Sequence, residues 1–181
     1  MSAARFIRPM HPKTAILPRP ESIQRILALG WVAQLKIHGH RAQVHIPADE
    51  NQPMVAFNRQ GKPHQRALPP QMIKELSRLL RPEKDWNVVD AEWIKPEAKL
   101  YLFDFVKREG KLLRELTFPE RWKLLPFDYL SPSLMTLSII RDQQGCLKAL
   151  ASPKAHIEGV VFKSSKTPGF ADTSIIRCRK K

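Results

Sequence analysis

The pattern that most restricts the fold is a series of short apolar runs, each closed by a glycine, a proline or polar residues. They lie at 31–37, 40–46, 53–59, 86–94, 99–106, 156–163 and 173–179. Short runs rich in β-branched and aromatic residues between turn signals are typical of strands. The first two flank His38 and Gly39, which predicts an antiparallel hairpin.

Three other segments have the spacing of helices. Residues 20–29 begin at a proline and end before Gly30, and residues 70–80 place an apolar stripe on one face before Pro82. Residues 117–127 begin with Thr117 and Glu120, the spacing of a capping box. The pattern of 132–151 does not separate helix from strand. Hairpin-like strands mixed with a few helices, without regular βαβ alternation, predict an α+β fold with largely antiparallel sheets.

Charge is the unusual property of the composition. The 181 residues hold 31 Lys and Arg against 17 Asp and Glu, a formal net charge of +14. An excess of this size favours a polyanionic partner, with nucleic acid ahead of an anionic membrane. The length fits one domain, 1–181, in which residues 1–20 form a basic N-terminal arm.

The remaining composition excludes several classes of protein. Two cysteines, Cys146 and Cys178, are too few for a disulfide framework or a cysteine-based zinc site. The first 20 residues lack the continuous apolar stretch of a secretory signal, and no run approaches the roughly 20 apolar residues of a membrane span. We therefore expect an intracellular protein, cytoplasmic or associated with the nucleoid or nucleus, with no membrane partner.

Charged residues recur where predicted strands begin or end. The longest such segment runs from Lys36 through Gly39 to Arg41. A basic residue and a turn follow at Arg59-Gln60-Gly61, and Asp90 and Glu92 share one face of a strand. Further along the chain are Phe103-Asp104, Glu158-Gly159-Val160-Val161 and Arg177-Cys178-Arg179.

In this order the motifs resemble the covalent nucleotidyltransferase superfamily of ATP-dependent DNA ligases, RNA ligases and mRNA capping enzymes. Lys36, Gly39 and Arg41 match the family's Lys-x-Asp-Gly-x-Arg motif, and the other segments match its later motifs. The resemblance covers nearly the whole chain. It implies two largely antiparallel sheets with flanking helices and a nucleotide-binding groove between them. The stretch 103–125 looks particularly like DNA ligases.

The resemblance implies a role for each matched residue. Lys36 attacks the α-phosphate of ATP and becomes a lysyl–AMP. Glu158 is the metal-side carboxylate for Mg²⁺ or Mn²⁺, and Glu92 contacts the ribose or a second metal. Phe103 and Val160 enclose the adenine, and Gln34 contacts its edge. The cations assigned to the nucleotide or to a 5′-phosphate are Arg41, Arg59, Arg177 and Arg179. Because a free lysine has a pKa of about 10.4, a nucleophilic Lys36 requires burial or neighbouring cations.

Two departures from the family pattern bear on function. His38 stands where the family has Asp, and the final Lys-x-Lys is Arg-x-Arg, whose side chains are never deprotonated. The sequence as printed also lacks the OB-fold domain of many members, so an accessory protein is a possible partner. We expect a monomeric ligase that seals nicked or broken DNA, in preference to RNA. The alternatives are an RNA ligase, a capping-type nucleotidyltransferase and a catalytically weak or inactive nick-binding module. His38, His40 and His45 are candidates for a metal site, but the pattern favours a pair of histidines at a turn.

Overall fold

The computed structural model describes residues 4–127 and 131–180, and its chain divides into two compact units. Unit 1 contains Met1–Arg8, Gly39–Leu113 and Arg121–Thr136. Unit 2 contains Pro9–His38, Arg114–Glu120 and Leu137–Lys181. Residues 1–3 of the predicted arm lie outside the described residues. Among the described residues, no helix combines the length and apolar character needed to cross a membrane.

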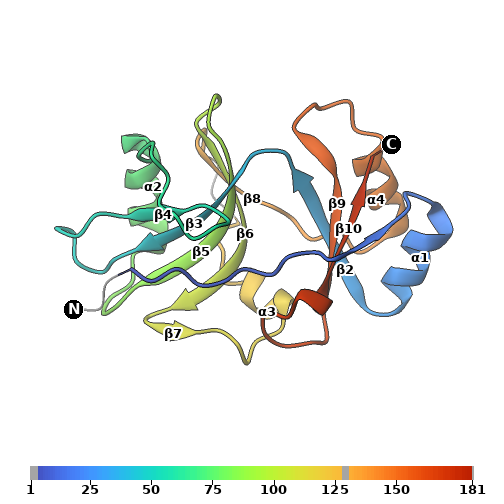
Figure 1. Ribbon diagram of the computed structural model, residues 1–181, viewed down its shortest axis with the longest axis horizontal. Coiled ribbons are helices and arrows are strands. Elements are labelled where there is room, and N and C mark those ends of the chain that lie inside the picture. The colour runs from blue at the N-terminus through green and yellow to red at the C-terminus, as the bar shows by residue number, and fades with distance from the viewer. Residues whose placement is uncertain (1–3, 128–130, 181) are drawn as a thin grey trace. The chain divides into compact units, whose positions relative to one another are not determined.

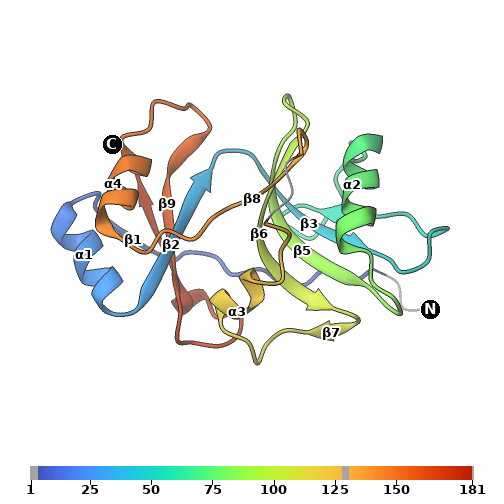
Figure 2. The same cartoon turned by 180° about the vertical axis from the view of Figure 1, so that it is seen from behind.

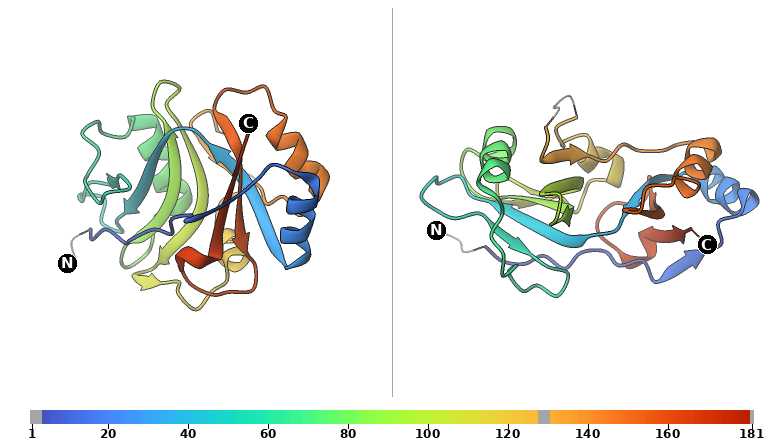
Figure 3. Two further views of the ribbon diagram at one scale, coloured as in Figure 1. Left: turned by 45° about the vertical axis from the view of Figure 1, so that its right-hand side comes forward. Right: turned by 90° about the horizontal axis from the view of Figure 1, so that it is seen from above.

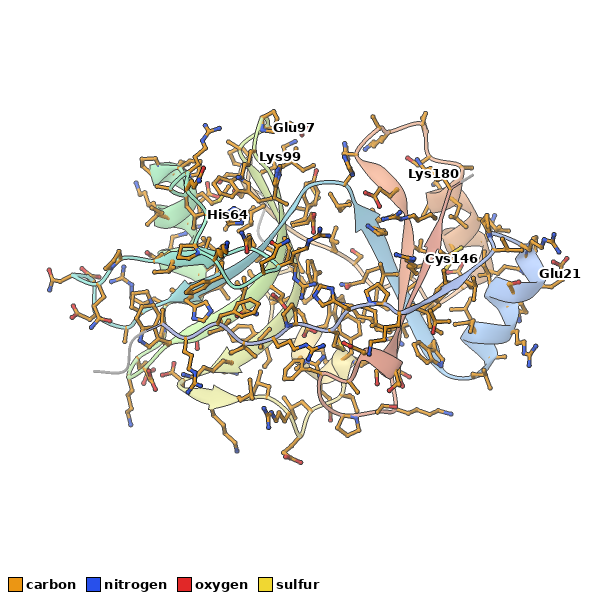
Figure 4. All side chains as sticks on the ribbon, in the orientation of Figure 1. Glu21, His64, Glu97, Lys99, Cys146 and Lys180 are labelled. Atoms are coloured by element: carbon orange, nitrogen blue, oxygen red, sulfur yellow. The ribbon has the colours of Figure 1, made fainter. Side chains whose placement is uncertain are left out.

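Unit 2 is built on a four-stranded sheet in the order β1-β10-β9-β2. Its strands are β1 (Thr14–Ile16), β2 (Trp31–Ile37), β9 (Ile157–Ser164) and β10 (Ile175–Arg179), the last preceded by a short 3₁₀ turn, Asp172–Ser174. Within this sheet, β1 and β10 pair in parallel, whereas β9 pairs antiparallel with both β10 and β2. Helices α1 (Pro20–Ala28) and α4 (Gln143–Leu150) lie side by side (Figure 2). They cover the sheet face that carries Ala33, Val160 and Phe162, and Cys146, labelled in Figure 4, packs in this layer.

Unit 1 is built on a six-stranded sheet in the order β4-β3-β5-β6-β7, with β8 paired in parallel to β6 (Figure 1). Its strands are β3 (His40–Ile46), β4 (Val55–Phe57), β5 (Asn87–Ile94), β6 (Lys99–Arg108), β7 (Lys111–Leu112) and β8 (Leu134–Thr136). Helix α2 (Pro70–Leu80) packs its apolar stripe on one face, against residues such as Val44, Ala91 and Trp93.

The two faces of this second sheet differ sharply. Alternation along β3 and β5 sends Ala42, Val44 and Ile46 toward α2 and leaves Arg41, Gln43 and His45 on the other face. Seen from above, α2 and the start of the N-terminal arm lie on opposite sides of the sheet (Figure 3). The polar face is therefore the one available for ligands and for the arm.

The predicted hairpin of 31–37 and 40–46 is wrong. Both strands exist, but β2 pairs with β9, whereas β3 pairs with β4 and β5 in the other sheet. Each strand buries its apolar residues under different helices, because Ala33 packs with α1 and α4 while Val44 packs with α2. The break at His38–Gly39 is thus a passage from one sheet to the next rather than a turn.

The predicted helices are largely correct in position. Segments 20–29 and 70–80 correspond to α1 and α2, whereas 117–127 shortens to α3 (Phe118–Trp122). The chain after Trp122 closes in i→i−3 bonds at Leu124 and Leu125 before Pro126. A residue before a proline avoids the helical conformation, which explains the early end. The ambiguous segment 132–151 holds both β8 and α4.

Candidate active site

Lys36 lies on the face of the unit 2 sheet opposite α1 and α4. Its register partner is Gly159 on β9, whose own partner on β10 is Arg179. The neighbouring row across the sheet is Gln34, Val161 and Arg177. Residues directly opposite one another point to the same face of a sheet. The strand pairing therefore places Lys36, Arg177 and Arg179 on one surface.

Glu158 joins this surface through a β-bulge. Lys36 pairs with Gly159, but Ile37 pairs with Ile157, so Glu158 is the unpaired extra residue. A bulge redirects the side chain of its extra residue. Gly159 has a φ of +144°, and a Cβ there would run into the carbonyl oxygen of Cys178. Glycine at this position allows β10 to approach the bulge closely.

Three cationic or hydrogen-bonding side chains converge on the Glu158 carboxylate. Lys36 Nζ lies 2.5 Å from Oε2, and His38 Nδ1 lies 2.5 Å from Oε1. Arg179 Nε lies 3.3 Å from Oε2. Partial burial alone would raise the pKa of Glu158. The hydrogen bonds from Lys36 and His38, together with the charges of Lys36 and Arg179, outweigh burial, so the pKa lies below its ordinary value. The carboxylate is therefore ionised and holds the lysine.

Gln34 is buried in unit 2, and both ends of its amide are hydrogen-bonded there. Its amide donates to the carbonyl of Leu137 at 3.0 Å and accepts from Lys163 Nζ at 3.0 Å, and the residue is 2% exposed. The Lys163 ammonium also lies 4.0 Å from the centre of the Phe118 ring. Sequence reasoning missed this buried lysine, because a lysine at the end of an apolar strand is indistinguishable from a surface charge.

Val160 is fully buried in the core beneath α1 and α4. Its neighbour Val161 occupies the face that carries Lys36. A residue enclosed among core side chains is not positioned to contact a nucleotide on the opposite face. Of these two valines, Val161 is the one that shares a face with Lys36.

In unit 1, Arg41 is fixed by Asp90. Arg41 Nη2 lies 2.6 Å from Oδ2 and Nε lies 3.3 Å from Oδ1, a two-point pairing that orients the guanidinium plane. The guanidinium also lies 4.8 Å from the centre of the Phe103 ring. Phe103 is itself the extra residue of a bulge, because Asp90 pairs with Asp104 and Ala91 pairs with Leu102. Both units thus use a bulge to present a predicted site residue.

The remaining predicted residues of unit 1 lie near this pair or at a turn. Glu92 is opposite Arg41 in the register of β3 and β5, so it shares the polar face with Asp90. Arg59 is exposed at the turn after β4, where Gly61 has a φ of +77°. His64, labelled in Figure 4, bonds the Arg41 carbonyl at 2.9 Å and supports the start of β3.

The fit of a divalent cation rests on Glu158. Mg²⁺ takes oxygen ligands, and one or two carboxylates with water and phosphate suffice. Glu158 supplies that chemistry, although both its oxygens already hold side chains of unit 2. Within the part of the chain that the structure describes, no group of three or more His, Cys, Asp and Glu side chains forms a metal cage. The alternative of a histidine metal site is therefore not supported: the His45 ring is buried beside Gln43 and Phe57.

Comparison with solved structures identifies the fold. The chain is similar to a mycobacterial DNA ligase D complexed with ATP and MES, with a TM-score of 0.56 and 16% identity over 82% of this chain and 54% of that one. It is also similar to the ligase domain of M. tuberculosis LigD, with a TM-score of 0.51 and 17% identity over 81% of this chain and 53% of that one. An archaeal ATP-dependent RNA ligase gives a TM-score of 0.52 and 16% identity over 94% of this chain and 48% of that one.

The fold is accordingly that of the nucleotidyltransferase, or adenylation, domain of ATP-dependent ligases. The chain spans about half the length of the solved structures it matches. No family model and no curated protein sequence matches it.

Proposed function

We propose that the protein is an ATP-dependent polynucleotide ligase that works through a lysyl–AMP on Lys36. A fold alone does not define an activity, so the proposal rests on the site. The observation that carries it is the ion pair of Lys36 with Glu158, flanked by Arg179 and formed where a bulge presents the carboxylate. The fold shared with DNA and RNA ligases supports the same class of chemistry.

The proposed first step exchanges one bond at phosphorus. Lys36 Nζ, after losing a proton, attacks the α-phosphorus of ATP, forming a P–N bond. The bond from that phosphorus to the bridging oxygen breaks, and pyrophosphate leaves. Arg177 and Arg179 lie on the same sheet face, where cations stabilise the charge that develops on the phosphates. A bound Mg²⁺, held by Glu158, would neutralise phosphate charge.

The later steps transfer AMP from Lys36 to a 5′-phosphate end. A 3′-hydroxyl then attacks that phosphate, forming the phosphodiester bond as the bond to AMP breaks and AMP leaves. A net charge of +14 suits this substrate, because phosphate contacts supply most sequence-independent affinity for nucleic acid. We propose a DNA nick as the preferred substrate, since residues 103–125 look more like DNA ligases. The proposal also includes an accessory protein that assists the ligase.

The test is the covalent intermediate. Incubation with α-labelled ATP and Mg²⁺ is expected to add one AMP to the wild-type mass, and Lys36→Ala is expected to lose the adduct entirely. Lys13→Ala is the matched control, because Lys13 is an ion-paired lysine of the same unit, bound to Asp172. Its variant is expected to label normally.

The same assay separates the alternatives. Nicked DNA, RNA and hybrid duplexes, offered to the adenylylated protein, rank the substrates by sealing rate. Labelling by GTP instead of ATP would indicate a capping-type enzyme. Tight binding to a nick, with no adduct in the wild type under any condition, would overturn the ligase proposal in favour of a binding module.

A further inference from the structure

The N-terminal arm is fastened to the polar face of the unit 1 sheet through one side chain. The Ile7 N–H donates to Gln43 Oε1 at 2.8 Å, and Gln43 Nε2 donates to the Ile7 carbonyl at 2.8 Å. The Gln43 amide thus satisfies both backbone groups of one residue, as a neighbouring strand would. Gln43 is 1% exposed, so loss of the Ile7 partners would remove one hydrogen bond from each end of a buried amide, which is costly.

An aromatic contact fixes the arm a second time. The Phe6 ring lies 6.0 Å from the ring of Phe57, centre to centre, on the same face. A Cβ on Gly61 would enter the Phe6 ring, so the turn after β4 leaves space for the arm only because this residue is glycine. Figure 1 shows the dark-blue start of the chain crossing this sheet.

Gln43 also belongs to the network that holds Arg41. Gln43 Nε2 lies 3.4 Å from Asp90 Oδ1, the same oxygen that accepts from Arg41 Nε. His45 Nε2 contacts Gln43 Oε1 at 3.1 Å and limits rotation of the amide from the other side. A continuous hydrogen-bonded path therefore runs from the Ile7 backbone through Gln43 and Asp90 to the Arg41 guanidinium.

We propose that the arm is a positioning element for the nucleotide-binding Arg41, acting through Gln43 and Asp90. Buried networks of this kind hold a functional side chain in one orientation, and each member restricts its neighbours. Without the arm, the Gln43 amide loses both partners at Ile7, and its contact with Asp90 is no longer directed. The inference rests on the proposed function only for the role of Arg41, since the path itself is a property of unit 1.

The first measurement needs no activity. In protein carrying ¹⁵N-labelled arginine, the Arg41 Nε–H resonance is identified by its loss in Arg41→Lys. Ile7→Pro removes the arm's N–H donor, and Gln43→Leu removes the linking amide. Both are expected to shift this resonance. The controls Ala4→Pro and Gln65→Leu place the same changes elsewhere in unit 1, and we expect them to leave it unmoved.

The second measurement separates positioning from general damage. Changes along coupled networks are worth about 0.5–2 kcal/mol, so the KM for ATP in lysyl–AMP formation is expected to rise roughly 2- to 30-fold in Ile7→Pro and Gln43→Leu. The rate at saturating ATP is expected to change less than the KM. A variant that simply loses folded protein would lower the rate and leave the KM unchanged.

The outcomes are distinguishable. An Arg41 resonance that is unmoved in both variants overturns the proposed path, whatever the activity. A shifted resonance with an unchanged KM shows that the arm moves Arg41 without serving nucleotide binding, and it overturns the positioning role. If the wild type forms no lysyl–AMP, the proposed function fails, while the resonance still decides whether the arm holds Arg41. Should Gln43→Leu fail to fold, Ile7→Pro alone carries the test.

Discussion

The two units hold their principal cations in different ways. In unit 2 the carboxylate that pairs with Lys36 is 21% exposed, and its other partners, His38 and Arg179, are mostly exposed. In unit 1 the carboxylate that pairs with Arg41 is 5% exposed and is also bonded to the buried Gln43. Although its Oε2 is itself buried, the Glu158 side chain reaches water more than that of Asp90, so an exchange of partners costs less at Glu158 than at Asp90. The arginine that would bind is therefore held more firmly than the lysine that would react.

The largest expected effect comes from breaking the buried pair. Asp90→Asn keeps the shape of the side chain but removes the charge opposite Arg41 and presents N–H groups to its donors. Loss of one partner of a buried pair costs about 3–5 kcal/mol, and we expect about 3 here because the Arg41 side chain is 18% exposed. Urea unfolding of the variant and the wild type measures this loss.

Asp49→Asn is the control, because Asp49 belongs to the same unit and its carboxylate accepts hydrogen bonds from Asn51 in its own turn. We expect it to change stability by less than about 0.5 kcal/mol. A similarly small effect of Asp90→Asn would show that Arg41 is not held by a buried charge, and the contrast between the units would disappear.

The same contrast explains which parts of the site could be predicted from sequence. Lys36, Glu158 and Arg179 lie in motifs whose order along the chain is informative, and the structure brings them together. Gln43 and Ile7 carry no such signal, because glutamine in a strand and isoleucine in an arm have many ordinary roles. Their pairing joins residues 36 positions apart and follows only from the packing of the arm on the sheet.

The errors in the fold have a similar cause. Local patterns placed β2 and β3 correctly but could not show which strands pair, because pairing depends on which helices cover each apolar face. The bulges at Glu158 and Phe103 likewise cannot be recognised from the alternation of apolar and polar residues along the strands, since one extra residue disturbs that alternation only locally. The register also decides that Val160 lies on the covered face of its sheet, whereas Val161 lies on the face of Lys36.

The second expected effect is a pH dependence of stability, which tests how well His45 on the polar face of unit 1 is shielded from water. Burial, with a smaller contribution from Lys107, lowers the pKa of His45 from 6.5 to about 4. Below pH 6.5 the unfolded chain binds a proton at His45, whereas the folded chain binds it only near pH 4. Stability should therefore fall as the pH drops from 6.5 to 4, by at most about 3 kcal/mol, and stay level below that for this group.

Denaturant unfolding between pH 7 and pH 5 measures the slope of unfolding free energy against pH, above the range in which most carboxylates titrate. His45→Gln keeps a donor for Gln43 and removes the titration, so its slope should be clearly shallower than that of the wild type. Part of the slope should survive, because burial also lowers the pKa of His64. An unchanged slope in His45→Gln would mean that water reaches this part of the sheet face.

The smallest expected effect on stability is that of the matching change in unit 2. Glu158→Gln is the same carboxylate-to-amide replacement as Asp90→Asn, but partly exposed ion pairs contribute little, so we expect a loss below about 1 kcal/mol near neutral pH. Because the pKa of Glu158 is lowered in the fold, its stabilisation is present above its ordinary pKa of 4.5 and is lost as the pH falls through the lower folded value. The variant should therefore converge with the wild type in acid, as followed by urea unfolding across that range. A loss as large as that of Asp90→Asn would show that Lys36 is held as rigidly as Arg41, and a reacting lysine would then have to break a costly buried pair.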